Sequence, residues 1–143
     1  MKNIKIPGIL LLLLSLLTSC AKTDTSPAGA CDQGVQISAS TYESAPTDEV
    51  TINSLVLSAD CLTINFSAGG CSGSTWDLKL VDSGAVMESF PPQRNLIFSL
   101  KNEELCYAFI TKEISFNLSE LQVEGNQVVL NITNTDDEVL YVY

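Results

Sequence analysis

The chain has 143 residues, with seven Lys and Arg, 17 Asp and Glu and no histidine, and its net charge is −10. This acidity disfavours binding to nucleic-acid phosphates and to anionic lipid surfaces, so we expect no nucleic-acid partner. The absence of histidine excludes Ser-His-Asp and Cys-His catalytic arrangements and histidine zinc sites.

The first 19 residues have the layout of an export signal. Lys2 and Lys5 precede an apolar run at residues 9–17 that only Ser15 interrupts. A membrane-spanning helix needs roughly 20 apolar residues, so this run is too short to anchor the protein. A charged start followed by a short apolar segment is typical of a cleaved signal peptide, which we predict at residues 1–19.

The segment Leu17-Thr18-Ser19-Cys20 resembles the lipobox of bacterial lipoproteins, in which one aliphatic and two small residues precede an acylated cysteine. The resemblance implies cleavage before Cys20, a diacylglyceryl group on its thiol and an acyl chain such as palmitate on the freed amine. Several acyl chains hold a protein on a bilayer essentially permanently. In the enterobacterial version of the sorting rule, an aspartate directly after the cysteine retains a lipoprotein in the inner membrane. The residue here is Ala21, which implies the outer membrane and leaves the leaflet open.

Cleavage would leave 124 of the 143 residues, a length that suits a single domain. Lys2 and Lys5 leave with the signal, so five Lys and Arg remain against 17 Asp and Glu, a net charge of −12. We expect residues 20–30 to form a lipidated cysteine followed by a flexible tether, because these residues are small and polar and show no apolar periodicity. Ten tether residues span on the order of 17 Å as a coil. The folded domain is expected at residues 31–143.

Four cysteines remain when Cys20 carries lipid, and an even number in a small exported domain predicts two disulfides. They are Cys31, Cys61, Cys71 and Cys106. A bridge between Cys61 and Cys71 is the least favoured, because an extended segment separates them. The two other connectivities stay open at this point. No pair has the C-x-x-C spacing of a redox or zinc site, so structural bonds are expected.

Apolar residues alternate with polar ones along most of the chain from residue 35, which is the period of half-buried strands. The expected strand faces are Val35, Ile37 and Ala39; Leu62, Ile64 and Phe66; Trp76, Leu78 and Leu80; Leu96, Phe98 and Leu100; Ile114, Phe116 and Leu118; Val128, Leu130 and Ile132; and Val139, Tyr141 and Tyr143. Turn-forming residues separate them at residues 58–60, 68–70, 82–84, 91–92, 101–104, 124–126 and 135–138.

No helix of useful length fits between these turns, and residues 50–57 fit a strand only with a bulge near Asn53 and Ser54. Short strands with one apolar face predict an all-β fold, namely an antiparallel β-sandwich of the immunoglobulin-like or Greek-key type.

Trp76 supports two interpretations. An exposed tryptophan would give a glycan-binding module of the cell surface a ring on which a sugar stacks, and Tyr42, Tyr107, Tyr141 and Tyr143 would add aromatic surface. However, Trp76 is in phase with Leu78 and Leu80, which favours a core position.

Carboxylates are the remaining candidates for catalytic residues or metal ligands. Glu103 and Glu104 are adjacent, as are Asp136, Asp137 and Glu138. Acidic residues in turns are usually solvated, so a carboxylate-based hydrolase is the least favoured function and we expect no enzyme and no cofactor. The second group also offers oxygen ligands to calcium, but it lacks the spacing that preorganises a calcium loop, and no metal is expected.

The body of the chain is similar to small exported bacterial β-proteins that are functionally uncharacterised. The shared features are Gly70-Cys71, Pro91-Pro92-Gln93, Cys106 and Ile114-Ser115-Phe116-Asn117-Leu118-Ser119. The resemblance implies a Cys71–Cys106 bridge, because these cysteines flank the shared segment, and it leaves Cys31 for Cys61. We therefore expect a non-catalytic envelope lipoprotein whose β-sandwich is a binding or structural module, with a protein or glycan partner that the sequence does not identify.

Overall fold

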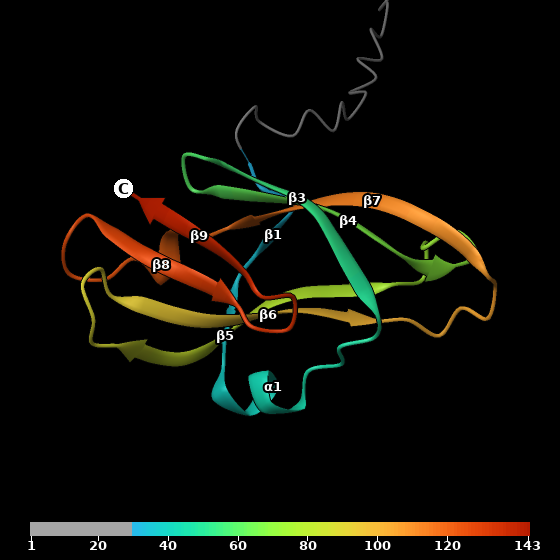
Figure 1. Ribbon diagram of the computed structural model, residues 1–143, viewed down its shortest axis with the longest axis horizontal. Coiled ribbons are helices and arrows are strands. Elements are labelled where there is room, and N and C mark those ends of the chain that lie inside the picture. Colours follow the sequence, from blue (N-terminus) through green and yellow to red (C-terminus); the bar gives the residue numbers. More distant parts are fainter. Residues whose placement is uncertain (1–29) are drawn as a thin grey trace, which may run out of the picture.

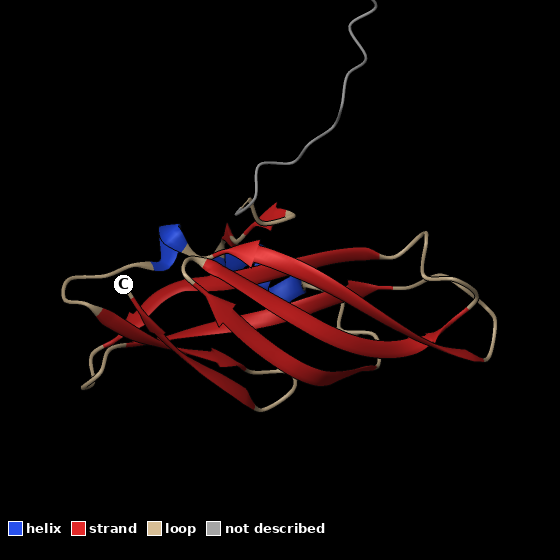
Figure 2. Cartoon of the chain, turned by 90° about the horizontal axis from the view of Figure 1, so that it is seen from above, coloured by secondary structure: helices blue, strands red, loops and turns tan. Residues whose placement is uncertain are grey.

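The computed structural model describes residues 30–143, which form two β-sheets packed face to face (Figure 1, Figure 2). The predicted all-β sandwich is confirmed. The predicted signal peptide at residues 1–19, the lipid site at Cys20 and the tether up to residue 29 lie outside the described residues.

Each sheet is assembled from strands distant in sequence. The first sheet has the order β1 (Gln33–Gly34), β7 (Ala108–Asn117), β4 (Cys61–Gly70), β3 (Val50–Ser58). The second has the order β2 (Gln36–Ile37), β5 (Asp77–Met87), β6 (Gln93–Lys101), β8 (Gln127–Ile132), β9 (Asp137–Val142). Two short helices, α1 (Ala39–Ser44) and the 3-10 turn η1 (Ser119–Leu121), complete the described part of the chain.

The long strands within each sheet are mostly antiparallel, as predicted, but three pairs are parallel. These pairs are β1 with β7, β2 with β5 and β6 with β8. The pair β6 and β8 is parallel because the chain leaves β6 for β7 in the first sheet before it returns to the second. A period-two pattern reports which face is buried and not the strand direction.

The core consists of the residues that the alternation marks. Leu62, Ile64, Phe66, Trp76, Leu80, Leu96, Phe98, Leu100, Phe116, Leu118, Leu130 and Ile132 are all buried, and Leu78 is half-buried against them. The bulge expected in β3 is confirmed, because its register with β4 shifts between Ile52 and Ser54.

The N-terminal segment differs from the prediction of one strand through Val35, Ile37 and Ala39. The chain passes from the first sheet to the second at Val35, whose side chain is buried, and Ile37 is exposed. Ala39 begins α1, because Ser38 caps the helix by accepting a hydrogen bond from Thr41 N at 3.2 Å.

Two of the predicted turns are strand. Residues 68–70 belong to β4, and residues 82–84 belong to β5, whose register with β6 shifts between Asp82 and Val86. Asp82 is buried in an ion pair with Arg94, with Nε–Oδ2 at 2.9 Å and Nη2–Oδ1 at 2.8 Å. Gly84 N also donates to Asp82 Oδ1, at 2.7 Å. A partner on the next strand therefore turns a loop-forming sequence into a bulged strand.

The disulfides are Cys31–Cys61 and Cys71–Cys106, with Cα–Cα distances of 5.7 and 4.7 Å. This is the pairing that the resemblance implied. Cys61 begins β4 and Cys71 follows its last residue, so the two bridges lie at opposite ends of one strand about 30 Å long.

Candidate functional site

Two connections between the sheets meet at one end of the sandwich. The chain passes from β4 to β5 through residues 71–76 and from β6 to β7 through residues 102–107. Cys71–Cys106 joins these connections covalently, at the right-hand end of Figure 1. We refer to residues 71–76 and 102–109, which include the start of β7, as the crossover tip.

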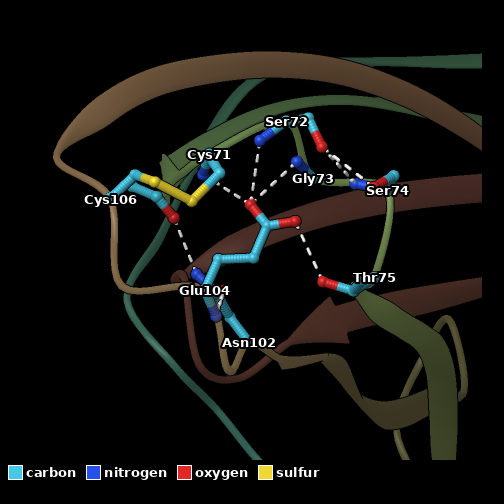
Figure 3. The surroundings of a disulfide bond; sticks show 9 residues. Cys71, Ser72, Gly73, Ser74, Thr75, Asn102, Glu104 and Cys106 are labelled. Carbon is cyan, nitrogen blue, oxygen red and sulfur yellow. Dashed lines mark hydrogen bonds between the residues drawn. A yellow bond between two sulfur atoms is a disulfide. The ribbon is translucent and has the colours of Figure 1, made fainter.

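Glu104 is a second link between the two connections. Its Oε2 accepts hydrogen bonds from Cys71 N at 2.5 Å, Ser72 N at 3.0 Å and Gly73 N at 3.0 Å, and its Oε1 accepts one from Thr75 Oγ1 at 2.9 Å (Figure 3). Three consecutive N–H groups therefore converge on one oxygen, and the chain turns directly after them at Gly73, whose φ of +65° favours glycine.

This arrangement stabilises the ionised carboxylate. The backbone N–H of Gly73, then that of Ser72, and the further bonds from Cys71 and Thr75 lower the pKa of Glu104 to about 2. A carboxylate with such a pKa stays charged near neutral pH, where a general acid must carry a proton. Glu104 therefore holds the two connections together, and the N–H groups that it binds already have their hydrogen-bond acceptor.

Trp76 packs against the inner side of the crossover tip. It is buried, its ring centroid lies 5.9 Å from that of Phe66, and Lys112 Nζ lies 5.6 Å from the ring while donating to Gly73 O. A Cβ at Gly70 or Gly73 would approach the indole to 2.9 Å, so glycine at these positions permits the packing. The core interpretation of Trp76 is confirmed, and a glycan platform on this ring is wrong.

Three large apolar side chains are exposed at the tip. Leu105, Tyr107 and Phe109 are 91%, 103% and 71% exposed. Along β7, Ile110 and Ile114 pack against the core, and alternate residues of an extended segment point to opposite sides. Tyr107 and Phe109 therefore belong to the outward row. Of this group the sequence indicated only Tyr107, as aromatic surface, and Leu105 and Phe109 were assigned to no element or site.

The predicted carboxylate candidates are not brought together as a pair. Glu103 forms an ion pair with Lys101 at 2.8 Å, while Glu104 binds the loop amides. Asp136 lies in the turn before β9, and Asp137 and Glu138 are successive strand residues with side chains on alternate faces. Within residues 30–143 no three His, Cys, Asp or Glu side chains form a group that could hold a metal ion.

A smaller apolar group lies at the opposite end of the sandwich. Val86, Met87 and Phe90 are exposed, and Phe90 reaches 96%. Val86, Met87, Pro92 and Val123 line a shallow hollow of about 490 Å³ there. Cys31–Cys61 lies at this end too, so the group is at the same end of the sandwich as the start of the described chain.

Comparison with known proteins shows the fold. No protein-family model matches the chain, and no curated protein is similar to it in sequence. A candidate toxin-related protein from Parabacteroides distasonis ATCC 8503 aligns with 78% of this chain at 20% identity and a TM-score of 0.55. A protein of unknown function, DUF1344, from Bacteroides vulgatus ATCC 8482 aligns with 78% at 18% identity and a TM-score of 0.51.

The aligned region is 59% and 55% of those two chains, so this chain spans little more than half the length of either. At such identities the likeness extends to the sandwich and not to any site. Among residues 30–143, no helix has the length and apolar character needed to span a bilayer, and α1 has only six residues.

Proposed function

We propose that this protein is an envelope lipoprotein, anchored through Cys20 in the outer membrane, whose β-sandwich is a non-catalytic binding module with the crossover tip as its binding end. The lipobox and the short signal support the anchor. Exposure of Leu105, Tyr107 and Phe109 at the cross-linked tip supports the binding end, because exposed apolar patches commonly mark interaction surfaces.

The observation that carries the proposal is the placement of the two disulfides. Cys31–Cys61 fixes the chain's entry to one end of β4, and Cys71–Cys106 fixes the tip at the other. An anchor preceding residue 31 and a tip about 30 Å away are what a module needs to reach a partner beyond its own membrane. Rigid cross-linking of the tip also lowers the entropy lost on binding.

The anchor is tested by metabolic labelling with radioactive palmitate. We expect the wild-type protein to be labelled and to sediment with membranes. Cys20→Ala, exported with an ordinary secretory signal in place of residues 1–19, is expected to be unlabelled and released, because it lacks the acylated thiol and no helix within residues 30–143 could span a bilayer. The double variant Cys31→Ser/Cys61→Ser is the control and keeps the label. Labelled or sedimenting Cys20→Ala would refute the anchor.

The binding end is tested by photo-crosslinking in intact envelopes. A benzophenone amino acid at position 107 is expected to give adducts, whereas the same residue at position 90, equally exposed at the opposite end, gives few. Both replacements exchange one exposed aromatic side chain for another, so neither disturbs the core. Equal adduct yields at the two positions, or none at position 107, contradict the assignment of the tip.

A further inference from the structure

The geometry points to a neutral glycan as the ligand, bound along the outer face of the first sheet beside the crossover tip; this inference rests on the proposed binding function. The surface, here called the outer strip, runs over three strands. Its members are Tyr107, Phe109, Thr111 and Glu113 of the β7 row, Gly69 and Asn65 of β4, and Asn53 of β3, with Ser67 of β4 buried between them.

Strand register aligns these residues. Phe109 pairs with Gly69, Thr111 with Ser67, and Glu113 with Asn65. Residues at alternate positions share one face of a sheet, so the row from Tyr107 to Glu113 lies on one surface about 20 Å long. Asn53, in the bulge of β3, joins the row through its hydrogen bonds to Asn65 and Ser67.

The tip end of the outer strip offers an aromatic ring with free space beside it. Phe109 is largely exposed, and its cross-strand neighbour Gly69 has no side chain. A Cβ placed on Gly69 would meet no atom within 4 Å. The ring is therefore flanked by flat backbone, which leaves room for a second flat surface to stack on it. The C–H face of a pyranose is such a surface, and Tyr107 extends the platform by two residues.

The rest of the strip supplies hydrogen-bonding groups in fixed positions. Asn53 Nδ2 donates to Asn65 Oδ1 at 2.9 Å and to Ser67 Oγ at 2.8 Å, and Ser67 Oγ lies 2.8 Å from Thr111 Oγ1. This network orients both amides. Within residues 30–143 it leaves Asn53 Oδ1 and Asn65 Nδ2 without a hydrogen-bond partner, one an acceptor and the other a donor. Sugar hydroxyls both donate and accept, so they match such a pair.

Charge favours a neutral ligand. The chain carries a net charge of −10, yet Glu113 is the only charged member of the outer strip. An anionic polysaccharide would be repelled by the protein as a whole and would meet no cation on the strip. A protein partner normally buries an apolar centre, whereas here the centre consists of amide and hydroxyl groups and the aromatic residues lie at one end.

Affinity electrophoresis of the mature chain, exported with Cys20→Ala so that no detergent is needed, tests the inference. The gels contain dextran, mannan, galactomannan or xylan as neutral probes and alginate as the anionic one. We expect at least one neutral polysaccharide to retard the protein and alginate not to. Phe109→Ala should weaken that retardation at least tenfold. Gly69→Glu should abolish it, because the new side chain covers the space beside the ring.

Matched controls separate the outer strip from general surface effects. Phe90→Ala removes an exposed aromatic at the opposite end, and Gly34→Glu adds a side chain at another strand glycine with open space around it. Both should bind as the wild type does. Lack of retardation by every neutral polysaccharide, retardation by alginate alone, or equal losses from Phe109→Ala and Phe90→Ala would overturn the glycan ligand.

A membrane is distinguished from a glycan with the same protein. Retention on phosphatidylcholine vesicles that Phe109→Ala abolishes, without retardation by any neutral polysaccharide, would overturn the glycan and keep the tip as a binding end. Failure of the tip itself is recognised independently, by the absence of position-107 adducts in the crosslinking experiment.

Discussion

Arg94→Ala is expected to lower the free energy of unfolding by about 3–5 kcal/mol, because it leaves a buried carboxylate without its counter-charge. Asp82 is fully buried and receives both the Nε and Nη2 hydrogen bonds of Arg94. Its remaining donor is the backbone N–H of Gly84, which does not neutralise a charge. Denaturant unfolding of the oxidised domain at neutral pH measures the difference.

The surface ion pair Lys79–Asp77, at 2.7 Å, is the matched control. Lys79→Ala removes a cation from the same strand as Asp82, but both partners are exposed, so a loss under about 1 kcal/mol is expected. The double variant Asp82→Asn/Arg94→Met should recover most of the stability lost in Arg94→Ala, because no charge stays buried and the new amide oxygen can still accept from Gly84 N. Similar losses in Arg94→Ala and Lys79→Ala would show that the inner pair is not isolated from solvent.

Phe116→Ala is expected to cost about 3–5 kcal/mol of unfolding free energy. Phe116 is fully buried in β7, and its ring packs edge-on to Phe98 at a centroid distance of 6.2 Å. Phe98 in turn packs against Phe66 at 5.0 Å, so a cavity at position 116 opens beside an aromatic cluster that joins the two sheets.

Phe109→Ala provides the control on the same strand, because it deletes the same side chain from the outward row. A loss under about 1 kcal/mol is expected there. Equal losses at positions 109 and 116 would mean that the two faces of β7 are not distinguished by burial.

Alternation of apolar residues was sufficient to predict the core and the sandwich. It depends on a local property, the two-residue period of a strand, which is visible wherever one face is buried. The incorrect turns at residues 68–70 and 82–84 arose because glycine and aspartate were interpreted locally. Asp82 is held in β5 by Arg94 on the next strand, and such a partner is invisible to a local pattern. Residues 68–70 stay in β4 through pairing with the start of β7.

The candidate site was much harder to predict. The hydrogen bonds of Glu104 connect residues that are about 30 positions apart and meet only when both connections between the sheets are folded. One local signal for the exposed row was nevertheless present. Ile114, Phe116 and Leu118 are at even positions, and extending their phase toward the N-terminus assigns Tyr107 and Phe109 to the outward side.

The positions of the two disulfides on β4 also determine how the molecule carries tension. A pull between Cys31 and Cys106 passes through Cys31–Cys61, along β4 and through Cys71–Cys106. The covalent path is then residues 61–71, about 35 Å when fully extended. Because β4 pairs with both β3 and β7, the force acts as shear along two ladders of hydrogen bonds at once. A pull at residues 107–109 is thus carried by a strand that is paired on both sides, and it does not peel the sheets apart from their ends.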